Sequence, residues 1–256
     1  MALPTFSRRS FRVWQRNRDV FLHLWRAETV PVFAEPIFIL VAMGWGLGGY
    51  VGSVEGQSYL FFIGPGIVAS YAMFSAIFEC TYGTYVRMHH QRTFDAIIAT
   101  PLNIEDVIAG EIFWAATRSL ITTCAILIVI AAFGLITSPW AILTPLLGVL
   151  GGLMFGAISM AVTSIVPSIY SYNYFFTLFT TPMFFFSGVF FPLSSLPEVV
   201  QKAAWFLPLT PMVNMTRALV QGRFHPGLLL ELLYVLAVTL VFFLLSLYGM
   251  RKRLIK

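Results

Sequence analysis

Charged side chains are scarce in this chain. They make up 11% of its 256 residues, and none occurs between Arg118 and Glu198. Soluble domains carry roughly 25% charged residues, and a helix needs about 20 residues to cross the hydrocarbon core of a membrane. The uncharged gap therefore has room for about three crossings. With 58% apolar residues and a mean hydropathy of +0.82, the composition excludes a soluble domain and predicts an integral membrane protein.

Cysteine and the common nucleotide-binding signals are also nearly absent. Cys80 and Cys124 both lie in apolar runs, and the four histidines are scattered, so neither a disulfide framework nor a metal site is expected. None of the three lysines precedes Ser or Thr, which a phosphate-binding loop requires. Gly44, Gly46 and Gly49 match the dinucleotide spacing, but they lie within an apolar run with no βαβ context. We expect no catalytic residue, metal or cofactor in this chain.

Six apolar segments remain, each bounded by polar or helix-breaking residues. They cover about 31–52, 57–85, 108–133, 141–165, 173–192 and 227–249. Each is long enough to span the bilayer, which predicts an all-α fold with six transmembrane helices. We divide the single domain 1–256 into 1–30, spans 1 and 2 (31–85), a polar loop (86–107), spans 3 to 5 (108–192), a connection (193–226), and span 6 with a basic tail (227–256).

The basic residues are distributed unequally between the two sides of such a fold. Residues 1–30 hold six, the polar segment 87–107 holds two and the C-terminal tail holds four, whereas the other side holds only three. The positive-inside rule therefore places both termini and the polar segment in the cytoplasm. Because this topology accounts for the net charge of +5, no nucleic-acid partner is expected.

Two segments outside the predicted spans, 1–30 and 193–226, are amphipathic. In residues 1–30, aromatic side chains alternate with arginines at roughly helical spacing, which predicts a helix in the lipid headgroup layer, with an ordinary basic flank as the alternative. These aromatic residues are Phe11, Trp14, Phe21 and Trp25. Residues 193–226 are too apolar for a free loop and predict short re-entrant helices in the outer leaflet, packed against other helices. An amphipathic loop on the membrane surface is the alternative.

Three of the charged residues within the apolar segments could meet: Glu79, Glu111 and Arg118. A charge near the bilayer centre costs several kcal/mol unless it is paired or faces water. We therefore predict an ion pair between Glu79 and Arg118, with Glu111 as a competing partner. A structural pair is favoured, and a direct role in a transport path is the alternative.

Two rows of glycines recur at four-residue spacing. Small residues at this spacing let two helices approach closely, so we predict close packing within one subunit, with a dimer contact as the alternative. The rows are Gly44, Gly48 and Gly52, and Gly148, Gly152 and Gly156.

The polar segment 87–107 interrupts the apolar runs on the basic side. It has mixed charge, contains the apolar turn Ala96 to Ile98, and is cut by Pro101. A protein that only sits in the bilayer would not need such a segment, so it predicts a docking element for another chain.

Several stretches together match one family over nearly the whole chain. They are EPIFILVAMGWGLGGYVG at 35–52, QRTFDAIIATPL at 91–102, GEIFWAAT at 110–117, PMFFFSGVFFPLSSLP at 182–197 and FLPLTPMVNMTRALVQG at 206–222. On these stretches the chain resembles the membrane subunits of ABC-2 type exporters, most closely the permeases that export nodulation factors, which are lipo-oligosaccharides.

The resemblance implies a six-helix permease of the bacterial inner membrane that forms a homodimer. It implies two separate ABC ATPase subunits, which hold ATP and Mg, bound to the loop 86–107. We predict that Arg92, Thr93, Asp95, Pro101 and Leu102 couple this loop to the ATPase, Pro101 by fixing the bend.

The resemblance further implies outward transport of an amphipathic cargo, most closely a lipo-oligosaccharide or lipid-linked glycan. A drug or lipid exporter is the alternative. A self-powered transporter or channel would need a chain of membrane-embedded acids or histidines, which we do not find.

Overall fold

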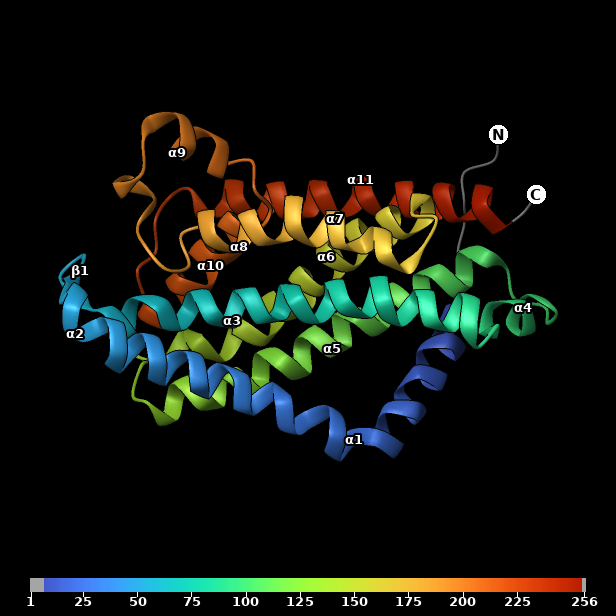
Figure 1. Ribbon diagram of the computed structural model, residues 1–256, viewed down its shortest axis with the longest axis horizontal. Coiled ribbons are helices and arrows are strands. Elements are labelled where there is room, and N and C mark those ends of the chain that lie inside the picture. Colours follow the sequence, from blue (N-terminus) through green and yellow to red (C-terminus); the bar gives the residue numbers. More distant parts are fainter. Residues whose placement is uncertain (1–6, 255–256) are drawn as a thin grey trace.

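The structure is a computed structural model that describes residues 7–254; residues 1–6 of the predicted N-terminal helix and the last two residues of the basic tail lie outside that range. It is a bundle of long helices that follow its longest axis (Figure 1). A short helix, α4 (Thr93–Ile98), and the end of α11 (Leu228–Leu254) mark one end. Helix α9 (Glu198–Ala204) and an antiparallel hairpin of β1 (Ser53–Val54) and β2 (Gln57–Ser58) mark the other. The predicted all-α class is confirmed.

Five helical stretches in the described range are long and apolar enough to cross a membrane. They are Ser10–Val51, Tyr59–His90, Ile104–Ala132, Pro139–Ile165 and Leu228–Leu254. They correspond to five of the six predicted spans, but their bounds differ at several ends.

The first stretch joins two elements that the sequence predicted to be separate. It consists of α1 (Ser10–Val41), the π-helix η1 (Ala42–Leu47) and α2 (Gly48–Val51). No break separates the predicted interfacial helix from the first span. Pro31 and Pro36 lie inside α1, where a proline removes a backbone hydrogen bond and bends a helix. Figure 1 shows that the first part of α1 runs at a steep angle to the part that continues into η1.

The second stretch extends farther than predicted. It consists of α3 (Tyr59–Phe78), η2 (Glu79–Gly83) and η3 (Val86–His90). Arg87 to His90, which we assigned to the polar loop, thus belong to this helix. After Arg92 and α4, helix α5 (Ile104–Ala132) begins four residues before the predicted span, because Asn103 and Asp106 form a capping box there. The loop is therefore shorter than 86–107.

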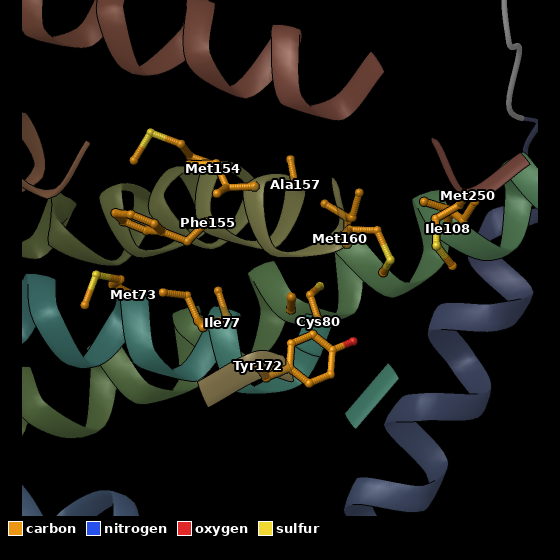
Figure 2. Close-up of a cluster of buried hydrophobic side chains, with 14 of the residues drawn as sticks. Met73, Ile77, Cys80, Ile108, Met154, Phe155, Ala157, Met160, Tyr172 and Met250 are labelled. Carbon is orange, nitrogen blue, oxygen red and sulfur yellow. The ribbon is translucent and has the colours of Figure 1, made fainter. Parts of the chain in front are cut away.

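The core lies between α3, α5, α6 (Thr144–Ile165) and α11. Helix α6 follows a short 3-10 helix, η4 (Pro139–Leu143). Figure 2 shows Met73 and Ile77 of α3 facing Phe155 and Met160 of α6. All four side chains are buried. Their packing fixes the helices that carry the charged residues described below.

One glycine row lies at a helix contact inside the subunit. A Cβ added to Gly152 of α6 would stand 2.6 Å from the Ala116 Cα atom of α5. Gly148 faces Thr123 and Gly156 faces Ala115 of the same helix. The row therefore lets α5 and α6 approach at backbone distance.

The other glycine row is not uniform. Gly44 faces Leu60 of α3, and Gly48 would make only ordinary contact with Tyr59. Gly52 has a φ of 69° and no neighbour within 4 Å of an added Cβ. Its role is to end α2 in a backbone conformation that glycine adopts readily, and the packing prediction does not describe it.

The predicted fifth span is only partly helical. After η5 (Ile169–Ser171), the helix runs through α7 (Tyr172–Phe175), η6 (Phe176–Thr180) and α8 (Thr181–Phe186). At 1.5 Å per residue it is about 22 Å long, whereas the hydrocarbon core is about 30 Å thick. The chain then turns at Gly188, whose φ is 77°. A sixth full crossing is not confirmed.

The connection 193–226 holds η7 (Leu193–Ser195), α9 and α10 (Leu209–Gln221). Helix α10 is largely buried rather than a loop on the surface. The Val220 carbonyl accepts hydrogen bonds from the backbone N–H groups of Thr137 and Ser138, both at 3.2 Å. The Gln221 side chain donates to the Phe61 carbonyl at 2.8 Å. These bonds attach α10 to the segment before η4 and to the end of α3 that lies opposite α4.

Candidate functional site: an ion network beside a short exposed helix

Arg87 of η3 forms two ion pairs inside the bundle. Its Nη1 atom lies 2.8 Å from Glu79 Oε1, and its Nη2 atom lies 2.5 Å from Glu111 Oε2. The Glu111 side chain is fully buried and that of Arg87 is 15% exposed. These pairs join α5 to η2 and η3 at the end of the second stretch. Removing one member of a buried ion pair would leave an uncompensated charge.

Arg118 of α5 extends the network to α1. Its Nη2 atom lies 2.5 Å from Glu28 Oε2, and its Nε atom lies 3.6 Å from Glu79 Oε2. The two carboxylate oxygens of Glu79 thus contact different arginines. The structure brings the predicted pair, Glu79 and Arg118, together, but at a longer distance than the other pairs of these two arginines, and Glu111 pairs with Arg87 instead.

Helix geometry places these side chains on common faces. Glu111 and Arg118 are seven residues apart on α5, which corresponds to about two turns and thus to one face. Between Glu79 and Arg87 lies Gly83, where an added Cβ would stand 3.2 Å from Glu79 Oε1 and 3.3 Å from Arg87 Nη2. A glycine at this position leaves room for the ion pair.

Helix α1 is attached to the same network. The Asn17 side chain donates to Glu111 Oε1 at 3.1 Å, and the Trp14 indole donates to Thr117 Oγ1 at 2.8 Å. An added Cβ on Gly110 would stand 2.7 Å from the Ser10 carbonyl oxygen, so α1 and α5 approach closely. The N-terminal part of α1 therefore packs on protein along one side, while Phe11 and Trp25 remain about half exposed.

Helix α4 lies at the exposed end of the bundle and contacts α1. Phe94 is fully buried and anchors the helix, whereas Arg92 and Asp95 are exposed. Arg16 Nη2 donates to Thr93 Oγ1 at 3.3 Å, which links α4 to α1. Arg92 has a φ of 50°, a left-handed conformation that begins the turn into α4.

The turn after α4 is also held by α1. Arg9 donates to the Pro101 carbonyl, and Pro101 itself is exposed while Leu102 is partly buried. Of the five predicted coupling residues, three (Arg92, Asp95 and Pro101) are thus exposed at one end of the bundle, and Thr93 contacts Arg16.

Both ends of the described chain pack at this end of the bundle. The Ser7 backbone N–H donates to Asp106 at 2.5 Å, and Arg251 lies 3.3 Å from Glu105. Arg253 contacts His89 at 3.1 Å. The described parts of the three basic regions therefore lie together, as the predicted topology requires.

A groove runs along α1 and is lined in part by residues of the ion network. Its part near α4 has a volume of about 430 Å³, and its part farther from α4 has a volume of about 550 Å³. Glu79, Gly83 and Arg118 line both parts, so the two are continuous. We call this space the α1 groove. It places the ion network on a surface that a ligand would reach.

Arg87, Glu28 and two further acidic residues were not predicted as site residues from the sequence. Arg87 counted as part of the polar loop, although its spacing from Glu79 across Gly83 was a usable signal. Glu35 lines the α1 groove, and Glu231 of α11 is 3% exposed and accepts a hydrogen bond from Asn214 at 2.7 Å. Both are acidic residues within apolar spans, which is itself a signal.

Among residues 7–254, no three His, Cys, Asp or Glu side chains are grouped so that they would hold a metal ion. What the described residues offer is ion pairing, hydrogen bonding and the exposed helix α4.

Comparisons with known proteins give a consistent result. The family described as ABC-2 type transporter matches residues 5–220. Nodulation protein J of Rhizobium leguminosarum bv. trifolii is 39% identical over 88% of this chain and 85% of the relative. Nodulation protein J of Rhizobium meliloti (strain 1021) is 37% identical over 99% and 97%. The inner membrane transport permease YadH of Escherichia coli (strain K12) is 24% identical over 79% and 78%.

Proposed function

This chain belongs to the ABC-2 type transporter family, and on that premise we propose that it is the membrane subunit of an ATP-driven exporter in the bacterial inner membrane. The observation that carries the proposal is a continuous set of contacts. It runs from Thr93 of α4 through Arg16 and Asn17 to the ion network, which joins α1, α5 and the η2 and η3 parts of the second stretch. A force applied to α4 from outside the membrane would reach three long helices through these contacts.

The partner in this proposal is a separate ABC ATPase, two copies of which serve a permease dimer and hold ATP and Mg. Helix α4 suits docking because Phe94 anchors it while Arg92 and Asp95 face outward. The proposed orientation places α4 and both termini in the cytoplasm, in keeping with the basic residues gathered at that end. In this orientation α10 lies on the outer side, and α7 and α8 form a short sixth crossing.

Coupling would work through rearrangement of ion pairs, not their loss. Glu79 contacts both arginines, so it can strengthen its contact with Arg118 as that with Arg87 weakens. Such an exchange keeps each buried charge paired while α1, α3 and α5 change their relative positions.

The second copy of the chain would cover the α1 side. Glu35 is exposed within an apolar helix, and Phe38 beside it is 70% exposed. A carboxylate at membrane depth is costly against lipid. The exposed face of α11, in contrast, is rich in leucines such as Leu240, which suits contact with lipid. We therefore place the homodimer contact along α1.

The cargo we propose is an amphipathic lipo-oligosaccharide or lipid-linked glycan moved outward. Its support is the similarity to nodulation proteins and an α1 groove that has both charged and aromatic lining. An exporter of drugs or other lipids is the second candidate, because a family alone does not select a cargo.

The test is reconstitution of the chain with and without its ATPase. We expect ATP-dependent cargo movement only when both proteins are present. Arg92→Glu should weaken co-purification with the ATPase and leave membrane insertion intact, because Arg92 is exposed and makes no ion pair within the described chain. Arg223→Glu, at the opposite end, is the matched control. Cargo movement driven by this chain alone, or undiminished binding of the Arg92→Glu variant, would contradict the proposal.

A further inference from the structure

Glu35 lies in the part of the α1 groove farther from α4 without a cationic partner. No Lys or Arg side chain within residues 7–254 forms an ion pair with it, although four other acidic side chains near α1 or α5 are paired. The Tyr71 hydroxyl is its neighbour across the groove. Glu35 has a hydrogen bond with Tyr71 but no cation to balance its charge, so this part of the groove is suited to a polar ligand group.

Aromatic rings form the apolar side of the same space. Phe74 and Phe78 of α3 and Phe184 of α8 line it, and the rings of Phe74 and Phe184 are 5.1 Å apart and nearly perpendicular. The Phe78 side chain is 50% exposed. The ring also packs against Tyr82 and Phe176, and its exposed part is suited to contact with a weakly polar ring.

Hydrogen-bond donors and acceptors also line this part of the groove. Thr122 and Ser75 share a hydrogen bond of 3.2 Å and line the groove beside Arg118 and Glu79. Glu35 and Glu79 accept hydrogen bonds, Arg118 donates them, and the hydroxyl groups do both. A ligand with several hydroxyl groups would satisfy such a set.

The charges select against ionic headgroups. A phosphate would face two carboxylates, Glu35 and Glu79. Arg118, the one guanidinium among the described residues that line this part, is already paired with Glu28 and Glu79. A quaternary amine would meet Glu35 but would also lie near Arg118. Neither ion is matched by this mixture, whereas an uncharged hydroxylated ring requires no net charge.

We propose that the part of the α1 groove around Glu35, Tyr71 and Phe78 is a binding subsite for the uncharged sugar end of an amphiphile. The apolar tail would lie within the groove, against its apolar lining residues Val32, Ile39 and Phe74. The inference rests on the proposed function for its biological setting, but binding itself is measured on the permease alone.

The test uses three amphiphiles with the same dodecyl chain. The full-length permease in phosphatidylcholine nanodiscs is photolabelled with a dodecyl maltoside that carries a diazirine next to the headgroup. Unlabelled dodecyl maltoside, dodecyl phosphate and dodecyltrimethylammonium then compete. We expect labelled peptides within 31–39 and 71–83, and competition by the maltoside at concentrations about tenfold below those of either ion.

Variants test the role of the carboxylate. Glu35→Leu should weaken maltoside competition about tenfold, which corresponds to the loss of a hydrogen bond to a charged group. Glu35→Gln keeps an acceptor and should lose less, and it guards against misfolding of the leucine variant. Glu198→Leu, on exposed α9, is the matched control and should behave as the unmodified protein.

Two results would overturn the inference: labelling confined to other surfaces, or competition by dodecyltrimethylammonium or dodecyl phosphate that equals competition by the maltoside. The proposed function fails separately. If the groove is labelled but the chain supports no ATP-driven export with its ATPase, the subsite remains and the exporter proposal fails. If export proceeds but the groove is not labelled, the reverse holds.

Discussion

Arg87→Met offers the sharpest test of the ion network. The variant keeps most of the side-chain volume but removes the cation that Glu79 and Glu111 share. Breaking a buried pair costs about 3 to 5 kcal/mol when one charge is left alone. Glu79 would keep its contact with Arg118 at 3.6 Å, and Glu111 would keep its hydrogen bond from Asn17 at 3.1 Å. We therefore expect the lower limit, about 3 kcal/mol.

The assay is thermal unfolding of the permease in nanodiscs, followed by tryptophan fluorescence. For soluble domains of comparable length, 1 kcal/mol shifts Tm by roughly 2 to 4 °C, so we expect a decrease of about 6 to 12 °C. Arg92→Met is the matched control, because Arg92 is exposed and its loss should shift Tm by less than about 2 °C.

A second variant separates the charge effect from packing. In Arg87→Met with Glu111→Gln, the fully buried carboxylate no longer carries a charge, so more than half of the lost stability should return. A single variant as stable as the unmodified protein would refute the argument. So would a double variant that is no more stable than the single one.

Three further outcomes follow from the packing and the proposed dimer. Gly152→Ala should lower the free energy of unfolding by about 1 to 3 kcal/mol, because its Cβ would meet the α5 backbone. Gly46→Ala has no neighbour within 4 Å and should leave the free energy of unfolding unchanged. Thermal unfolding of both variants checks this. Gly83→Ala should reduce ATPase stimulation by cargo, because its methyl group would lie 3.2 Å from Glu79 Oε1, and undiminished stimulation would count against the network's role. Disulfide cross-linking in a background free of native cysteines should yield dimers for Phe38→Cys on α1 but not for Leu240→Cys on α11, and the opposite pattern would place the dimer contact on α11.

The sequence predicted the helical class and the basic end because both depend on composition and charge counts, which no packing detail overrides. Helix ends were less predictable. Arg87, Glu105 and Asp106 were taken as loop residues because they are charged, yet each belongs to a helix and finds a partner. A charged residue can lie inside a helix when it forms a buried ion pair. Its partner is distant in the sequence, so the pair cannot be predicted from the local sequence alone.

The candidate site was predicted in part for the same reason. The sequence indicated Glu79, Glu111 and Arg118, since each lies in or beside an apolar run. It did not assign Arg87 to them, because its partner Glu111 is 24 residues away on another helix. The joining of α1 to the first span was also missed, because the change from basic to apolar composition looked like a boundary although the backbone continues through it.

The helix is continuous from Ser10 to Val51, so the direction in which each side chain points depends on the number of residues before it. In an α-helix one residue turns everything that follows by about 100°. Glu28 and Glu35 are seven residues apart, so both face the α1 groove, one beside Arg118 and the other beside Tyr71. Inserting a single residue between them would keep composition, hydropathy and charge, yet would swing Glu35 out of the groove. The length of this stretch should therefore resist insertion and deletion more strongly than its individual side chains resist replacement.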